Sequence, residues 1–295
     1  MSYQSPYFKN TDEDPEYEAR KVLAEVDWDG SLPIDLIDIC EKYGLEYIFA
    51  PDSSMQEEGS TKFREEGDFY IFINTKDSDC VDGFSNNLTK RRRQRFTFAH
   101  ELAHCSYESH TDLNVQVELG NKKNPHGRMY QKVRENQANQ FAAHLLMPRE
   151  AFRKFSRQVG WTNISRLIQR ATNEFDVSME VAAQQISRLA EYPCISILFD
   201  RNGTPKRTPV YSEEFKETKL FYPKHQNVPG GTAAEQLLST SNQNAQSRKK
   251  FPDASIWFIE APDWRAEKFS ITETSLRLGQ YGVLTFLEVS EVETY

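Results

Sequence analysis

The sequence predicts an α+β protein with more than one domain, and three observations support this fold class. The chain has 295 residues, which is more than one small hydrophobic core needs. Helical periodicity dominates the chain before Pro193, interrupted by a group of short strands, and strand patterns take over afterwards. We therefore expect a first domain at 1–155, a helical extension at 156–192 and a small α/β domain at 193–295.

Four helices are expected in the first domain, where apolar residues recur three and four positions apart. Their ranges are 15–26, 33–43, 89–107 and 129–147. Gly44 should end the second helix, and Pro148 should end the fourth. Aromatic and β-branched side chains predict strands at 45–50, 60–64 and 69–74, the last two joined as a hairpin. Residues 75–90 are expected to form a long loop.

Shorter elements are expected in the rest of the chain. Helices are predicted at 162–174 and 179–190, and a short helix at 232–238 opens with a capping box of Thr232 and Glu235. Five strands are predicted after Pro193, at 194–200, 208–215, 255–261, 268–276 and 282–290.

Composition and charge argue against several classes of protein. A net charge of -8 argues against a chain that binds nucleic acid over most of its surface. The sequence has neither a signal-peptide core nor a run of 18 apolar residues, so we expect no membrane association. The cysteines are widely spaced without a CxxC pair, which favours reduced thiols and a cytoplasmic location. They are Cys40, Cys80, Cys105 and Cys194.

The segment HELAH at 100–104 is the strongest motif in the chain. On a helix, His100 and His104 lie one turn apart on the same face, so both imidazoles can reach one tetrahedral metal ion. Glu101 lies beside them and is placed to polarise a metal-bound water. The motif therefore predicts a zincin-like metallopeptidase domain with Glu101 as the catalytic base. The alternative is a pair of structural or exposed histidines.

A catalytic zinc needs a third protein ligand, and Glu135 is the best candidate. It lies at the edge of the apolar stripe of an amphipathic helix, ENQANQFAAHLLMP. Asn139 follows one turn later, where it can orient a ligand histidine. The alternative is that Glu135 is a solvated residue near a helix end. Weaker histidine candidates are His110, His126 and His144.

The segments RQRFTFAHELAH (93–104) and ENQANQFAAHLLMP (135–148) together resemble the ImmA/IrrE metallopeptidase family. The resemblance extends over about residues 15–190, with departures at Ala103 and Glu108 and a longer segment at 75–90. It implies a zinc ion bound by His100, His104 and Glu135. It also implies that Glu101 is the catalytic base. It also implies a substrate, a helix-turn-helix repressor that is cleaved under stress such as DNA damage to derepress defence or mobile-element genes.

The chain is similar, more loosely, to family members that guard antiviral operons and respond to single-stranded DNA through a C-terminal sensor domain. The C-terminal strands fit a small GAF- or PAS-like module. Cations and aromatic residues alternate here, a pattern that suits single-stranded nucleic acid but also an ordinary half-buried strand pair. The candidate contacts are Lys206, Arg207, Lys216, Lys219, Tyr211 and Phe221, with Lys224, Phe215 and Tyr222 in the same region.

Cys80 and a basic run suggest two further hypotheses. A thiolate at Cys80 would be able to fill the open position of the zinc as a releasable plug, although a free loop thiol is the simpler alternative. The basic run suggests phosphate contacts with DNA or, equally, a solvated face. Its members are Lys90, Arg91, Arg92, Arg93 and Arg95.

The substrate is expected to pair, in extended form, with the edge of the strand at 69–74. The alternative function is a zinc-containing regulator that binds a repressor or DNA without cutting it.

Overall fold

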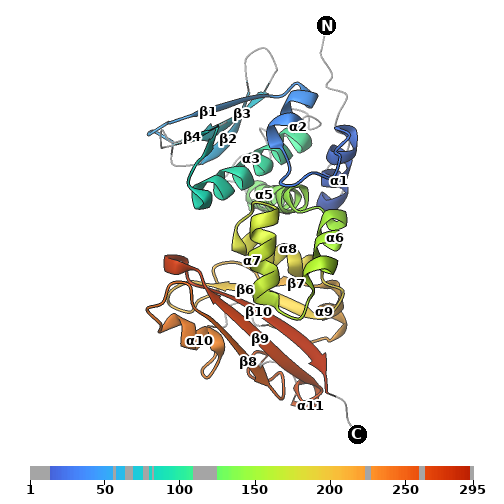
Figure 1. Cartoon of the computed structure of the whole chain (residues 1–295), viewed down its shortest axis with the longest axis vertical. Coiled ribbons are helices and arrows are strands. Elements are labelled where there is room, and N and C mark those ends of the chain that lie inside the picture. Colours follow the sequence, from blue (N-terminus) through green and yellow to red (C-terminus); the bar gives the residue numbers. More distant parts are fainter. Residues whose placement is uncertain are drawn as a thin grey trace. The chain divides into compact units, whose positions relative to one another are not determined.

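The computed structural model describes residues 14–55, 58–63, 69–75, 80–81, 83–108, 125–222, 227–258 and 263–292. It confirms the α+β class and forms two compact units (Figure 1). The first unit comprises Met1–Lys154 with Asn173–Ser178, and the second comprises Phe155–Thr172 with Met179–Tyr295. The helices predicted as an extension at 156–192 thus contribute to both units, and their independence as a domain stays a prediction. No described helix is long and apolar enough to cross a membrane.

The first unit contains a three-stranded sheet in the order β1-β3-β2. Its strands are β1 (Glu46–Ala50), β2 (Gly59–Phe63) and β3 (Phe69–Asn74). β1 pairs with β3 in parallel, whereas β2 pairs with β3 antiparallel, which confirms the predicted hairpin. β3 is therefore the central strand, flanked on both sides.

The segment predicted as a long loop at 75–90 contains a second, two-stranded sheet, so that prediction is partly wrong. β4 (Cys80–Val81) pairs with β5 (Phe84–Ser85). Gly83 lies between them at φ +84°, a conformation that favours glycine. The hairpin packs on β1, since the Phe84 ring lies 5.0 Å from that of Phe49. Strands of two residues are too short for any alternation to appear in the sequence.

The four helices predicted for the first unit are all present. They are α1 (Pro15–Glu25), α2 (Leu36–Tyr43), α3 (Leu88–Glu108) and α5 (Pro125–Leu146). α2 begins later than predicted because Asp35 caps it, accepting hydrogen bonds from the amides of Ile37 and Asp38. Gly44 ends α2 in the left-handed conformation, as expected. α3 packs against α5, β2 and β3, and α1 packs against α5.

One helix was missed by the sequence analysis. α6 (Arg149–Val159) begins directly after Pro148, where the preceding helix was expected to end. Ala151, Phe152 and Phe155 are buried along one side of it, a helical spacing in REAFRKFSRQV that the stop signal at Pro148 obscured. Proline ends one helix here and precedes the next, because its fixed φ suits the start of a helix.

The second unit is built on a five-stranded antiparallel sheet in the order β7-β6-β10-β9-β8. Its strands are β6 (Cys194–Phe199), β7 (Val210–Tyr211), β8 (Gln246–Phe251), β9 (Phe269–Arg277) and β10 (Val283–Glu291). Three predicted strands are thereby confirmed, at 194–200, 268–276 and 282–290.

The other two strand predictions in this unit are wrong over most of their length. In 208–215 only Val210–Tyr211 is a strand, because Ser212 caps α9 (Glu213–Glu217) through the Phe215 amide, at 3.1 Å. Residues 255–257 form a turn and 258 belongs to no regular element, while 259–261 lie outside the described residues. The missed strand is β8, a polar edge strand whose sequence, QSRKKF, lacks an apolar alternation.

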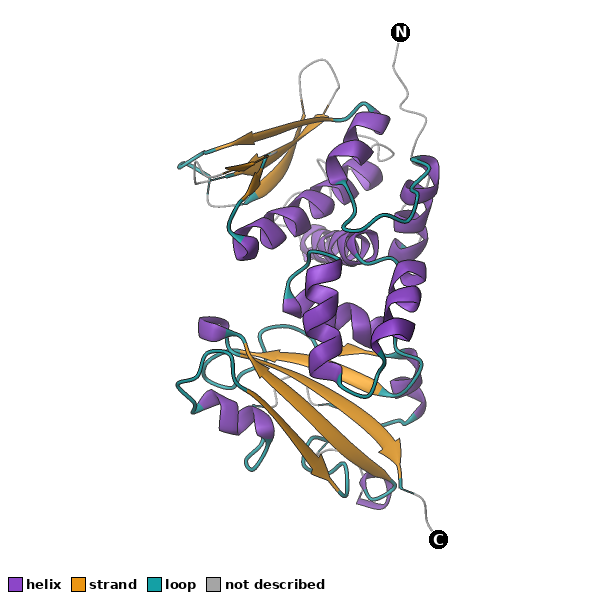
Figure 2. Cartoon of the chain, in the orientation of Figure 1, coloured by secondary structure: helices purple, strands orange, loops and turns teal. Residues whose placement is uncertain are grey.

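Helices cover both faces of this sheet (Figure 2). On one face, α10 (Ala233–Leu238) packs against β8, β9 and β10. On the other, α8 (Met179–Leu189) follows α7 (Ile164–Glu174) and packs against β6 and β7. α11 (Asp263–Ala266) contacts β9. The GAF- or PAS-like assignment of this unit stays a prediction.

The capping box at α10 is confirmed in part. Thr232 accepts a hydrogen bond from the Glu235 amide, but the Glu235 carboxylate accepts from Gly231 rather than from Thr232. The first free amides of α10, those of Ala233 and Ala234, donate instead to the buried carboxylate of Glu273 on β9, at 3.0 and 2.7 Å. One buried acid thus holds the helix on the sheet.

Replacing Glu273 by Ala should destabilise the second unit, because two buried amides lose their acceptor. We expect a loss of about 2–3 kcal/mol in the free energy of unfolding, measured by urea denaturation. Glu235→Ala is the control, since its carboxylate is exposed and should cost well under about 1 kcal/mol. Equal losses in the two variants would contradict the role of Glu273.

Candidate metal centre

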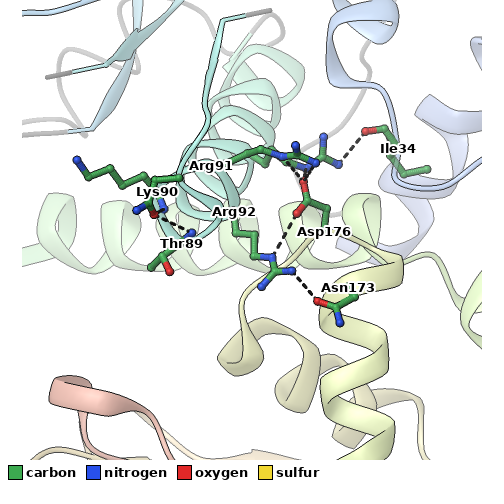
Figure 3. Close-up of polar contacts among 9 residues, drawn as sticks. Ile34, Thr89, Lys90, Arg91, Arg92, Asn173 and Asp176 are labelled. Carbon is green, nitrogen blue, oxygen red and sulfur yellow. Dashed lines mark hydrogen bonds and ion pairs between the residues drawn. The ribbon is translucent and has the colours of Figure 1, made fainter. Parts of the chain in front are cut away.

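The helix that carries HELAH is held at its N-terminal end by a buried acid, Asp176, which is 4% exposed. Arg91 Nε donates to its carboxylate at 2.7 Å and Arg92 Nε at 3.2 Å (Figure 3). Arg92 also donates to Asn173 at 2.9 Å. Arg95, itself buried, lies 3.4 Å from the same carboxylate. All these residues belong to the first unit, so the contact anchors α3 within it.

The basic run therefore differs from both interpretations considered for it. Three of its five cations converge on Asp176 instead of lying free on a solvated face. Arg93 forms an ion pair with Glu58, and Lys90 is exposed. A DNA surface needs exposed cations, and this run offers few.

Changing Asp176 to Asn should destabilise the first unit strongly, because Arg95 would stay buried without its counter-charge. Asparagine keeps the shape of the side chain and tolerates the left-handed backbone at this position, φ +49°. We expect a loss of about 3 kcal/mol in the free energy of unfolding, measured with urea. Glu58→Gln breaks the exposed pair with Arg93 and should cost less than about 1 kcal/mol.

Two helices bring the predicted ligand atoms together. His100 and His104 lie one turn apart on α3, with their Nε2 atoms 3.1 Å from each other. Glu135 on α5 reaches both: one carboxylate oxygen lies 3.2 Å from His100 Nε2, and the other lies 3.6 Å from His104 Nε2. One ligand atom from each residue can be chosen so that all lie within 4.8 Å of one another.

This spacing fits one tetrahedral metal ion. Ligand atoms bonded to zinc at 2.0–2.1 Å stand about 3.3 Å apart, close to the 3.1 Å between the two imidazole nitrogens and the 3.2 Å between His100 Nε2 and one Glu135 oxygen. Two neutral imidazoles and one carboxylate are also the donor set of many catalytic zinc sites. His100 hydrogen-bonds Glu135 and thereby lowers the pKa of that carboxyl, which keeps it ionised and ready to bind a cation.

The site is open on the side of Glu135. The Glu135 side chain is 59% exposed, whereas those of His100 and His104 are only 15% and 13% exposed. Glu135 nevertheless contacts both imidazoles, unlike a freely solvated glutamate. A catalytic metal keeps one position for water or substrate, and an exposed third ligand leaves room for it.

Glu101 lies next to these residues but faces a different element. Its side chain is buried and accepts a hydrogen bond from Thr61 on β2, at 2.9 Å. Burial raises the pKa of the Glu101 carboxyl, while His104 and His100 partly oppose this rise. A carboxyl whose pKa is raised is a stronger base, which suits taking and returning a proton.

The remaining residues predicted near the site differ in position and burial. Asn139 lies one turn after Glu135 and is half-buried, and its orienting role stays a prediction. Cys80 lies on β4, but its side chain is outside the described part of the chain, so the plug hypothesis stays a prediction. His110 lies outside the described residues altogether. Cys105 is buried. His144 is buried 3.9 Å from Glu16, within the first unit.

The nucleic-acid candidates in the second unit differ in their surroundings. Arg207 pairs with Glu180 and Lys216 with Glu213, at 3.2 and 2.8 Å. Tyr211 is half-buried against the Phe215 ring, and Phe221, at 53%, is the only exposed residue among the described aromatic candidates. Lys206 and Lys219 are exposed, and Lys224 lies outside the described residues. Base stacking needs several exposed rings, so this hypothesis gains no support here.

Sequence reasoning missed two residues of this region, Thr61 and Asp176. Thr61 stands in a short polar strand and carries no motif. Asp176 had only an indirect signal, since any cation of the basic run that becomes buried is expected to have a charged partner.

The geometry defines a candidate mononuclear metal site of the HExxH type. Residues 84–187 match the family Peptidase_M78, described as the IrrE N-terminal-like domain. This segment therefore belongs to the ImmA/IrrE family, as the motifs predicted. No curated protein matches the chain. A solved structure described as a Mycobacterium tuberculosis transcriptional regulator shares the fold, with a TM-score of 0.58 and 14% identity over 95% of this chain and 76% of that chain.

The purified protein should bind one zinc ion per chain, and Glu135→Ala should weaken binding because one of three protein ligands is lost. We expect the dissociation constant to rise more than about a hundredfold, since even partners of ligands contribute ten- to a hundredfold. Competition with a chromogenic chelator measures this change. Asn136→Ala, the exposed neighbour on α5, is the control and should leave the affinity unchanged.

Proposed function

We propose that this chain is a zinc-dependent endopeptidase whose metal is held by His100, His104 and Glu135, with Glu101 as the catalytic base. The observation that carries this proposal is the convergence of two imidazoles and one carboxylate, with ligand atoms within 4.8 Å of one another, beside the buried carboxyl of Glu101. The family match at 84–187 supports the same reaction class.

The residues of the site have distinct tasks in this reaction. A zinc ion held there would lower the pKa of water and polarise the scissile carbonyl. Glu101 is placed to take the proton from the attacking water and to return it to the leaving amine. The exposed side of Glu135 leaves the approach to the site open for a polypeptide.

The expected docking edge for the substrate needs correction. The strand at 69–74 is β3, which lies between β1 and β2 and has no free edge. The strand beside Glu101 is β2, which ends the sheet. The Asn74 amide donates to the Glu58 carbonyl at 2.9 Å, so the backbone groups of Glu58 point toward β3. Successive residues of an antiparallel strand alternate in this respect, so the backbone groups of Gly59 and Thr61 point away from β3. We propose that an extended substrate segment pairs with this outer edge of β2.

The proposed substrate is a helix-turn-helix transcriptional repressor, cleaved in the cytoplasm in response to DNA damage or single-stranded DNA. Family membership at 84–187 supports a repressor substrate, and the fold shared with a transcriptional regulator is compatible with it. Cleavage would derepress defence or mobile-element genes.

A Glu101→Gln variant tests the enzymatic role. The substrate is a purified helix-turn-helix repressor from the same gene neighbourhood, and cleavage is followed by electrophoresis and mass spectrometry. Glutamine cannot accept the proton, so cleavage should fall by about a hundred- to ten-thousandfold while zinc occupancy and repressor binding are retained. Glu150→Gln, an exposed residue at the start of α6, is the control.

Two results would count against an enzyme. If wild-type protein with bound zinc leaves the repressor intact, or if E101Q releases the repressor from DNA as well as wild type does, the chain acts as a non-cleaving regulator.

A further inference from the structure

β2 crosses α3 at unusually close range, and Gly59 permits this approach. A Cβ atom built at Gly59 would lie 2.4 Å from Thr97 Cγ2 and 3.2 Å from Glu101 Cγ. The first distance is far below van der Waals contact, so any larger residue would push the strand away from the helix. The strand therefore lies against the helical stripe that carries Thr97, Glu101 and Cys105, at i, i+4 and i+8.

Thr61 stands two residues after Gly59 and so projects from the same face of β2. Its hydroxyl lies 2.9 Å from Glu101 Oε2 and 3.2 Å from the Glu101 carbonyl oxygen, with Cys105 Sγ at 3.9 Å. A carboxylate only accepts hydrogen bonds, so the hydroxyl donates to Glu101. The neighbouring residue Ser60 projects from the opposite face, and its buried hydroxyl has no hydrogen-bond partner among the described residues.

We infer that Thr61 is a positioning residue for Glu101, holding one carboxylate oxygen against β2 so that the other is presented for proton transfer. This inference rests on the role of Glu101 proposed above. A buried glutamate has several rotamers, and a hydrogen bond from a rigid strand selects one of them. Errors of about 1 Å in the placement of a reacting group cost about a hundredfold in rate.

The same strand would also receive the substrate. The backbone groups of Thr61 lie on the outer edge of β2, while its side chain holds the base. One residue thus joins the docking edge to the carboxyl, so the distance between a paired substrate and the base is set within β2.

The first arm of the test measures repressor cleavage by Thr61→Val, Thr61→Ser and Ser60→Ala. Valine has the shape of threonine but cannot donate, so kcat should fall about ten- to a hundredfold while KM and zinc occupancy stay unchanged. Serine restores the donor and should recover most of kcat. Ser60→Ala removes an adjacent hydroxyl that has no such contact and should behave as wild type.

The second arm needs neither metal nor activity. In metal-free protein, Thr61→Val should lower the melting temperature by about 4 °C, because it leaves a buried carboxylate oxygen without its donor. In a Glu101→Ala background the same substitution should lower it by much less, since the acceptor is already gone. Circular dichroism during heating measures both.

The outcomes separate this inference from the proposed function. Unchanged kcat in an active Thr61→Val enzyme, or equal melting shifts in both backgrounds, would overturn the positioning role. A rise in KM alone would also overturn it. If wild type does not cleave, the proposed function fails, and the melting comparison still decides whether Thr61 holds Glu101.

Discussion

The packing of α3 against α5 is the contact on which the candidate site depends. α3 supplies two imidazoles and α5 supplies a carboxylate, and neither helix alone offers a complete set of ligands. Both helices bury alanines near the site, Ala99 and Ala103 on α3 and Ala138 and Ala142 on α5. Small buried side chains allow a close approach of helix axes, which brings Glu135 within reach of both histidines.

Two further contacts hold α3 from other directions. Near its start, Asp176 pairs with three arginines, and for the buried Arg95 it supplies a counter-charge. Near its middle, β2 lies against the stripe containing Glu101, at a distance that only Gly59 permits. β2 thus supports α3 on the side of Glu101, and α5 supports it on the side of the two histidines. Supporting contacts of this kind make a site geometrically defined.

The two carboxyl groups of the site differ because their surroundings differ. Glu135 is exposed and hydrogen-bonded by an imidazole, so its pKa is lowered and it suits a cation. Glu101 is buried, so its pKa is raised and it suits proton transfer. Opposite shifts in neighbouring carboxyls are a common way to divide ligand and base roles in one site.

The sequence by itself determined the features that depend on local spacing. These are the helices around HELAH and Glu135, the hairpin of β2 and β3, and the long strands β6, β9 and β10, because helical and strand periodicity are read from neighbouring residues. The tertiary structure alone decided the central position of β3, the polar edge strand β8, the acid that anchors α3 and the hydroxyl that holds Glu101. Each of these depends on which distant segments meet, and contacts between distant segments leave no period in the sequence.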